Sequence, residues 1–414
     1  MSFRFLAAAL AATVALPLGA AKAVDLEVTH WWTSGGEAAA VGEMAKAVNG
    51  AGIKWVDGAI AGGNNARPII ISRITGGDPM GATQLNTGKD GLDLMKAGLM
   101  TDLTDLANKE GWKDVIRPGK LLDSCIVDGK VFCVPVNIHS FQWMWLNRSV
   151  FEANGLAVPK NWTEFVAAAP ALKEKGVIPL AVGGEPWQIS GMSGVFMVAI
   201  GGVDLYKKIN VEKDAATAAG PEMTKVFEAI AQARGLIDDG TTGRAWNDAA
   251  NMVITGKAAA QIMGDWAQGE WQVAGKVAGK DYDCLPGLGL NPVLDTGGDA
   301  FFFPKPKGDN KELVEAQLKM ASLLVSKETQ VAFNLKKGSL PIRADVDLNT
   351  ANDCMEKGIE ILKDPANILP SAEQTMSSDT QGQLEDLWVE FFNTPEMAVA
   401  DAQKKFADII AASK

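Results

Sequence analysis

Tryptophan and carboxylate side chains stand close together at several points of this sequence. Trp31 and Trp32 are adjacent, Trp266 directly follows Asp265, and Trp246 precedes another aspartate by two residues. An indole offers a flat apolar face and one N–H donor, whereas a carboxylate accepts hydrogen bonds. Because a sugar ring combines an apolar C–H face with a rim of hydroxyls, these residue types are typical of a carbohydrate site. Core packing is the alternative for each indole taken alone.

The motifs of common enzyme classes are missing from the sequence. His30 and His139 are the two histidines, and neither a Gly-x-Ser-x-Gly nor a His-Glu-x-x-His segment occurs. No Gly-x-Gly-x-x-Gly or phosphate loop follows an expected strand, so we expect no cofactor. A glycosidase needs only two carboxylates, and the 50 Asp and Glu residues leave that alternative open.

One acidic segment has the spacing of a calcium-binding loop. Asp345, Asp347 and Asn349 alternate, and Glu356 stands at the twelfth position. Thr350 occupies the sixth position, where a calcium loop requires glycine for its sharp turn. We therefore expect a solvated acidic turn and no metal site.

Length and charge narrow the class of protein. The chain has 414 residues, 47% of them hydrophobic and 21% charged, which predicts two or three globular domains. Its net charge is −11, so a nucleic-acid partner is not expected, because an acidic chain repels phosphate backbones.

The N-terminus has the pattern of an export signal. Arg4 precedes the apolar run from Phe5 to Leu18, and the small-x-small sequence 21–23 follows. We predict a signal peptide over 1–23 and a periplasmic location. Export permits disulfides. Cys125 and Cys133 flank an Asp-Gly turn, where they either pair across a hairpin or pack in the core.

The remaining two cysteines, Cys284 and Cys354, are 70 residues apart and would have to meet in space. Their pairing stays open at this point.

Strands and helices alternate along the first part of the chain. The sequence predicts a strand at 25–30, a helix at 38–48 and a strand at 53–56, which is the rhythm of a sheet with helices on its faces. Further helices are expected at 68–74, 161–175, 221–234, 309–327, 327–335 and 397–412. Since no linker separates them, we expect intertwined lobes.

The segment Val134-Pro-Val-Asn-Ile-His-Ser-Phe-Gln-Trp-Met-Trp-Leu-Asn147 resembles the sugar-binding proteins of ABC importers, and more closely their glucose/mannose-binding branch. The likeness continues through Gln261-Ile-Met-Gly-Asp-Trp-Ala267 and Lys336-Lys-Gly-Ser-Leu-Pro341. It implies an α/β, two-lobed periplasmic-binding-protein fold with interdomain crossing strands and a central ligand cleft. The N-terminal lobe would hold 24–137 and 298–342, and the C-terminal lobe 138–297 and 343–414.

The same resemblance implies a set of ligand-binding residues, with His139 and Asp265 as further near-site residues. The matched positions are Trp31, Trp32, Glu37, Lys89, Trp246, Asp299 and Lys337. The branch usually has a histidine where this chain has Gln374. Glutamine keeps a hydroxyl contact but loses the imidazole's flat face and titration.

The resemblance implies a monomeric receptor that closes on a monosaccharide, a glucose-like aldohexose, and delivers it to a membrane permease. Three tryptophans around a small pocket favour a single ring. The alternatives are a receptor for a disaccharide or sugar conjugate and, from another class, a secreted glycosidase.

Overall fold

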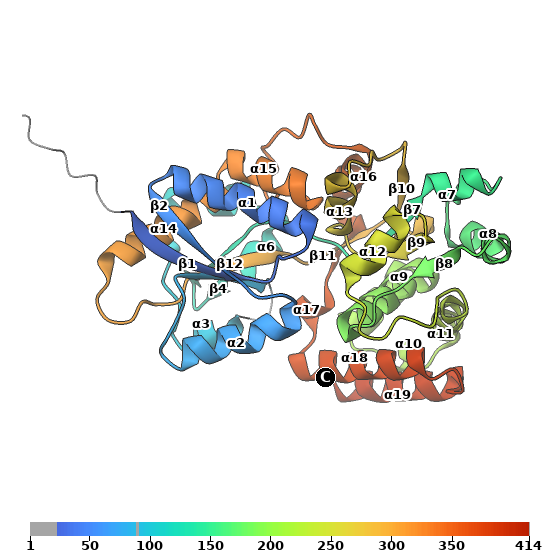
Figure 1. Ribbon diagram of the computed structural model, residues 1–414. Helices are drawn as coiled ribbons and strands as arrows, with labels where there is room; N and C mark the ends of the chain where they lie inside the picture. Colours follow the sequence, from blue (N-terminus) through green and yellow to red (C-terminus); the bar gives the residue numbers. More distant parts are fainter. Residues whose placement is uncertain (1–22, 88–90, 414) are drawn as a thin grey trace, which may run out of the picture.

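A computed structural model describes residues 23–87 and 91–413. Two α/β lobes stand side by side, each built around its own sheet (Figure 1). The predicted signal peptide lies, but for Ala23, outside the described residues, and so does Lys89.

The first lobe contains a five-stranded sheet in the order β2-β1-β3-β12-β6. Strand β1 is parallel to β2 and β3, whereas β12 is antiparallel to β3 and β6. The strands are β1 Val24–His30, β2 Ile53–Ala59, β3 Ala82–Asn86, β6 Cys133–Pro135 and β12 Asp299–Phe302. The helices are α1 Gly35–Gly50, α2 Gly63–Thr75, α3 Leu92–Lys96, α4 Thr104–Lys109, α5 Trp112–Val115, α6 Gly119–Asp123, α14 Lys311–Val325 and α15 Lys327–Lys337.

The second lobe contains a four-stranded sheet in the order β10-β7-β9-β8. Its strands are β7 Trp143–Asn147, β8 Ile178–Ala181, β9 Ala258–Ile262 and β10 Tyr282–Pro286. Its helices are α7 Arg148–Ala153, α8 Trp162–Glu174, α9 Pro186–Asn210, α10 Ala215–Ala218, α11 Pro221–Arg234, α12 Trp246–Ile254, α13 Ala267–Val273, α16 Asp353–Leu362, α17 Ala372–Thr375, α18 Ser378–Asn393 and α19 Val399–Ala412. Short 3-10 turns occupy Gly287–Gly289 and Pro365–Asn367.

The chain passes between the lobes where short strand pairs meet. β6 belongs to the first sheet and β7 to the second, and the segment joining them bridges Ile138 to Leu340 and His139 to Gly297. β11 Leu294–Thr296, which directly precedes β12 in the chain, pairs in parallel with β13 Ile368–Pro370. These crossings intertwine the lobes. The exact lobe borders stay a prediction.

One expected helix needs correction, and one helical segment was not expected. The helix expected to begin at Pro68 begins five residues earlier, at Gly63, because Gly62 with φ 80° turns the chain ahead of it. The helical segment α9, which is kinked at Gly202 with φ 85°, was not predicted. It is long and apolar enough to cross a membrane by composition, yet it packs on α11 and α18, and 56% of its most apolar window is buried. It is therefore a core helix of the second lobe.

The structure pairs all four cysteines in two disulfides. Cys125 and Cys133 form a disulfide across the hairpin of β4 Ile126–Val127 and β5 Lys130–Val131, with 5.0 Å between their Cα atoms. Cys284 on β10 is joined to Cys354 on α16. The second disulfide ties a late helix to the second sheet.

Candidate ligand-binding cavity

A cavity of about 720 Å³ opens between the two lobes. The first lobe contributes Trp31, which follows β1, and Glu37 at the start of α1. The second lobe contributes Trp187, Trp246 and Trp266 from the N-terminal ends of α9, α12 and α13. The volume of the cavity falls in the range of about 300–1,000 Å³ that is typical of small-molecule sites.

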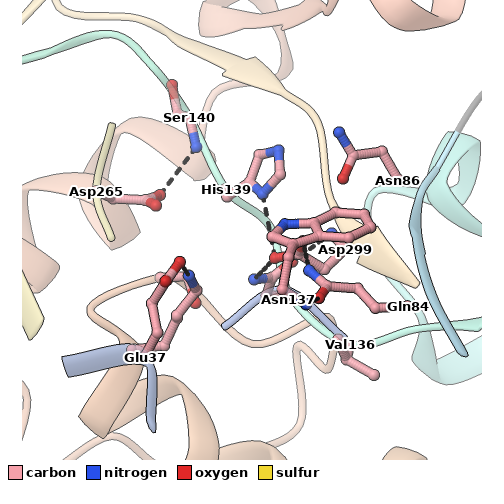
Figure 2. A network of polar contacts seen from close by, with 12 residues as sticks. Glu37, Gln84, Asn86, Val136, Asn137, His139, Ser140, Asp265 and Asp299 are labelled. Carbon is pink, nitrogen blue, oxygen red and sulfur yellow. Dashed lines mark hydrogen bonds and ion pairs between the residues drawn. The ribbon is translucent and has the colours of Figure 1, made fainter. Parts of the chain in front are cut away.

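Asp299, the first residue of β12, is held by three side chains at the crossing between the lobes (Figure 2). Its carboxylate accepts from Gln84 Nε2 at 2.7 Å and Asn137 Nδ2 at 2.8 Å, and lies 3.3 Å from His139 Nδ1. Burial disfavours the charged carboxylate, but the charge and hydrogen bond of His139 outweigh it and hold the pKa of Asp299 well below its ordinary value. The cavity therefore contains a fixed anion.

His139 is the positive partner of that anion. Burial disfavours its charged ring, but the hydrogen bond and charge of Asp299 prevail and raise the pKa of His139 to about 9. Asp265 behaves differently, because burial raises its pKa to about 7 despite the opposing charge of His139. Its carboxylate accepts from the backbone N–H of Ser140 at 2.9 Å (Figure 2).

A buried ion pair forms part of the cavity lining. Lys337 Nζ is 2.8 Å from Glu37 Oε1, and both side chains are less than 10% exposed. Ser34, the N-cap of α1, donates its hydroxyl to the same carboxylate at 3.1 Å. Because breaking such a pair leaves a buried charge, we interpret each residue as holding the other in place.

The neighbouring indole, Trp32, is almost completely buried. Its ring packs on Phe301 and Phe333, and Lys337 Nζ lies 5.3 Å from its centroid. Trp31 is only partly buried, and the guanidinium of Arg67 lies 4.8 Å from its ring. Of the adjacent pair, Trp31 offers the more accessible face.

Three rings form an aromatic wall on the second lobe. Phe141 lies 5.4 Å from Trp266 and 6.2 Å from Trp187, centroid to centroid. The two indoles are 6.2 Å apart, and His139 packs edge-on against Trp266. Sequence reasoning did not select Phe141, Trp187 or Trp266 as site residues. The sequence signal that could have identified Trp266 was its position directly after Asp265.

The structure brings most of the expected site residues to this cavity. Those that line it are Trp31, Trp32, Glu37, His139, Trp246, Asp299 and Lys337. Asp265 and Gln374 are not among the described residues that line it. Both side-chain amide atoms of Gln374 are buried without a hydrogen-bond partner, and the preceding Glu373 lines the cavity and accepts from Asn86 at 2.9 Å.

The acidic turn with calcium-like spacing is occupied by ion pairs. Asp345 lies 2.7 Å from Arg343 and 2.9 Å from Lys327. Within 23–87 and 91–413, no group of three His, Cys, Asp or Glu side chains has the geometry to hold a metal ion.

Fold and cavity together define a two-lobed binding protein, with crossing segments at the base of the cleft and aromatic rings on its walls. Residues 49–330 match the family model described as bacterial extracellular solute-binding protein. The chain belongs to this family.

Relatives and solved structures extend the comparison. The chain is 38% identical over 362 residues to a probable sugar-binding periplasmic protein of Rhizobium meliloti, covering 87% of this chain and 86% of the relative. A xylose/arabinose-binding protein of Haloferax volcanii is 25% identical, covering 82% and 74%.

Among solved structures, a bacterial solute receptor with a stated preference for β-D-galactopyranose matches with a TM-score of 0.75 and 22% identity, covering 93% and 97%. A raffinose complex matches with a TM-score of 0.72 and 18% identity, covering 94% and 98%. These likenesses confirm the predicted two-lobed α/β fold of periplasmic binding proteins.

Proposed function

We propose that this chain is a periplasmic receptor that captures a glucose-like aldohexose in the central cavity and delivers it to the permease of an ABC transporter. One observation carries the proposal: indoles from both lobes line a cavity that also contains the ionised carboxylate of Asp299. Aromatic faces cover the C–H face of a sugar, and the carboxylate orders its hydroxyls. The relatives named as sugar-binding periplasmic proteins support the same function.

The hydrogen bonds of Asp299 define what it offers a sugar. A carboxylate has about four acceptor positions, and Gln84, Asn137 and His139 occupy three of them. About one position is left for a ligand hydroxyl. We therefore assign the carboxylate of Asp299 a single strong hydrogen bond from one ligand hydroxyl. The three side chains that hold the carboxylate fix the direction of that hydrogen bond.

Contacts between the lobes support closure around the ligand. Glu270 on α13 accepts from the backbone N–H of Gly36 on α1 at 2.7 Å. Asn86 at the end of β3 donates to Glu373 on α17 at 2.9 Å. A sugar that touches both lobes binds the closed state better than the open state, and it shifts the population accordingly. The closed monomer would then dock on the permease.

The proposal is tested by titrating the ligand-free protein with glucose while following tryptophan fluorescence. Trp266→Ala removes an indole from the aromatic wall, so we expect the Kd to rise at least tenfold, or about 1.4 kcal/mol. Trp55→Ala is the matched control, because Trp55 is half-buried on β2 and is not among the described residues that line the cavity. Equal Kd values for Trp266→Ala and the wild type would contradict the proposed site.

The glycosidase alternative is tested on the same samples. Incubation of the protein with maltose and cellobiose, followed by chromatography, should return both sugars unchanged. Release of glucose would show that paired carboxylates of the cavity hydrolyse the ligand.

A further inference from the structure

Asp295 is a second carboxylate at the base of the cavity, and the family resemblance did not select it. It is the middle residue of β11, on the crossing segment that continues into β12 and Asp299. Its side chain is partly exposed and lines the cavity, and no ion pair to it occurs within the part of the chain that the structure describes. The crossing segment therefore carries two carboxylates into the cavity, and the proposed function uses only Asp299.

One oxygen of Asp295 is fully occupied by the protein. Oδ1 accepts from the hydroxyl of Ser140 at 2.5 Å and from the backbone N–H of Phe141 at 2.9 Å. Ser140 Oγ in turn accepts from the backbone N–H groups of Asp295 and Gln142, each at 3.2 Å. A hydroxyl has one donor and about two acceptor positions, so Ser140 has its donor only for Asp295. These bonds fix the orientation of the carboxylate.

The other oxygen, Oδ2, receives no hydrogen bond from any of the described residues. A carboxylate oxygen offers about two acceptor positions, so Oδ2 has both of them available to a ligand. Burial raises the pKa of Asp295, and the hydrogen bonds from Ser140 and Phe141 oppose that shift. A ligand hydroxyl is the kind of donor that Oδ2 lacks.

Phe141 connects this acceptor to the aromatic wall. Its ring lies 5.4 Å from that of Trp266, centroid to centroid, and its backbone N–H holds Asp295. We propose that Asp295 is a further sugar-binding residue, whose Oδ2 accepts a hydrogen bond from one hydroxyl of the ring that packs on the aromatic wall. The proposal rests on the proposed function.

Such a contact makes Asp295 a determinant of specificity. A hydrogen bond to a carboxylate is about twice as strong as one between neutral groups. A sugar that lacks the hydroxyl leaves Oδ2 without a donor and shut off from water, which costs affinity. The receptor therefore selects sugars that have a hydroxyl at this ring position.

The test is Asp295→Asn, with binding measured by calorimetry. Ser140 and Phe141 both donate at Oδ1, so the amide oxygen of the variant takes that place and the amide nitrogen replaces Oδ2. A donor then meets the sugar hydroxyl where an acceptor is needed. The Kd for glucose should rise at least tenfold.

The five monodeoxy forms of glucose separate a lost contact from a general distortion of the cavity. One of them, the sugar without the hydroxyl that meets Asp295, should bind the wild type at least tenfold more weakly than glucose. In Asp295→Asn and in Asp295→Ala, its Kd should come within threefold of the glucose Kd, and the other four ratios should stay as in the wild type. A distorted cavity would weaken every sugar without changing any single ratio, and that result would overturn the assignment.

Asp283→Asn is the matched control. Asp283 is also a partly exposed aspartate, but it pairs with Arg148 at 2.7 Å and is not among the described residues that line the cavity. This variant should leave every Kd unchanged.

A crystal structure of the wild type with glucose keeps the test independent of how the variants fold. A sugar oxygen should lie within about 3.0 Å of Asp295 Oδ2. A sugar whose oxygens all lie beyond hydrogen-bond distance, or an unchanged glucose Kd in Asp295→Asn, would overturn the assignment and leave the receptor function standing. Failure of the wild type to bind glucose would overturn the proposed function, and the role of Asp295 with it.

Discussion

The pair formed by His139 and Asp299 should make the stability of this protein fall as pH rises above neutrality. The pKa of His139 is about 9 in the folded chain, against an ordinary value of 6.5. Between these values the folded state holds a proton that the unfolded state has lost, so the free energy of unfolding decreases with pH. At about 1.36 kcal/mol per pKa unit, the full contribution is about 3 kcal/mol. This stabilisation is fully present below pH 6.5 and is lost by about pH 9.

Urea unfolding followed by tryptophan fluorescence measures this loss directly. The wild type should lose about 3 kcal/mol of unfolding free energy between about pH 7 and pH 9.5, seen as a lower midpoint at constant m-value. His139→Gln removes the titrating ring and should remove this part of the pH dependence. A wild-type midpoint that stays flat or rises over the same range would refute the assigned pairing of His139 with Asp299.

Three further predictions concern the surroundings of the cavity. Glu37→Ala leaves the ammonium of Lys337 buried without its partner and should lower the free energy of unfolding by about 3–5 kcal/mol in urea titrations; an unchanged midpoint would contradict it. Gly36→Ala places a Cβ 2.4 Å from the backbone of α13 and should lower the melting temperature, whereas Gly42→Ala should raise it or leave it unchanged. Asp265→Asn should stabilise the protein above about pH 7, where the wild type must ionise a buried carboxyl, and equal stability at pH 8 would argue against that burial cost.

Local patterns in the sequence were sufficient for many of the elements. The helix expected at 221–234 has those bounds, and the one expected at 161–175 spans Trp162–Glu174 with Asn161 as its N-cap. Apolar spacing and capping residues act within a few turns, so they can be recognised from the sequence. The long α9 was not predicted from the sequence because it is apolar on most sides and lacks the periodicity of an amphipathic helix.

The candidate site was only partly predictable, because its residues come together through long-range crossings. Asp299 reaches Gln84 across 215 residues of sequence, and Lys337 reaches Glu37 across 300. The family resemblance pointed to Asp299, Lys337 and Glu37 but not to Gln84, and it did not reveal that Lys337 and Glu37 pair with each other. Both Trp32 and Trp266 line the cavity, but periodicity could not show that core rings bury Trp32 almost completely whereas Trp266 is only partly buried.

Isothermal titration calorimetry of the ligand-free protein with glucose, mannose, galactose and xylose tests the central claim most directly. The account predicts saturable one-to-one binding of an aldohexose, with the sugar recovered intact afterwards. Absence of heat for all four sugars, together with an unchanged tryptophan spectrum, would contradict the assignment of the cavity to a hexose ring.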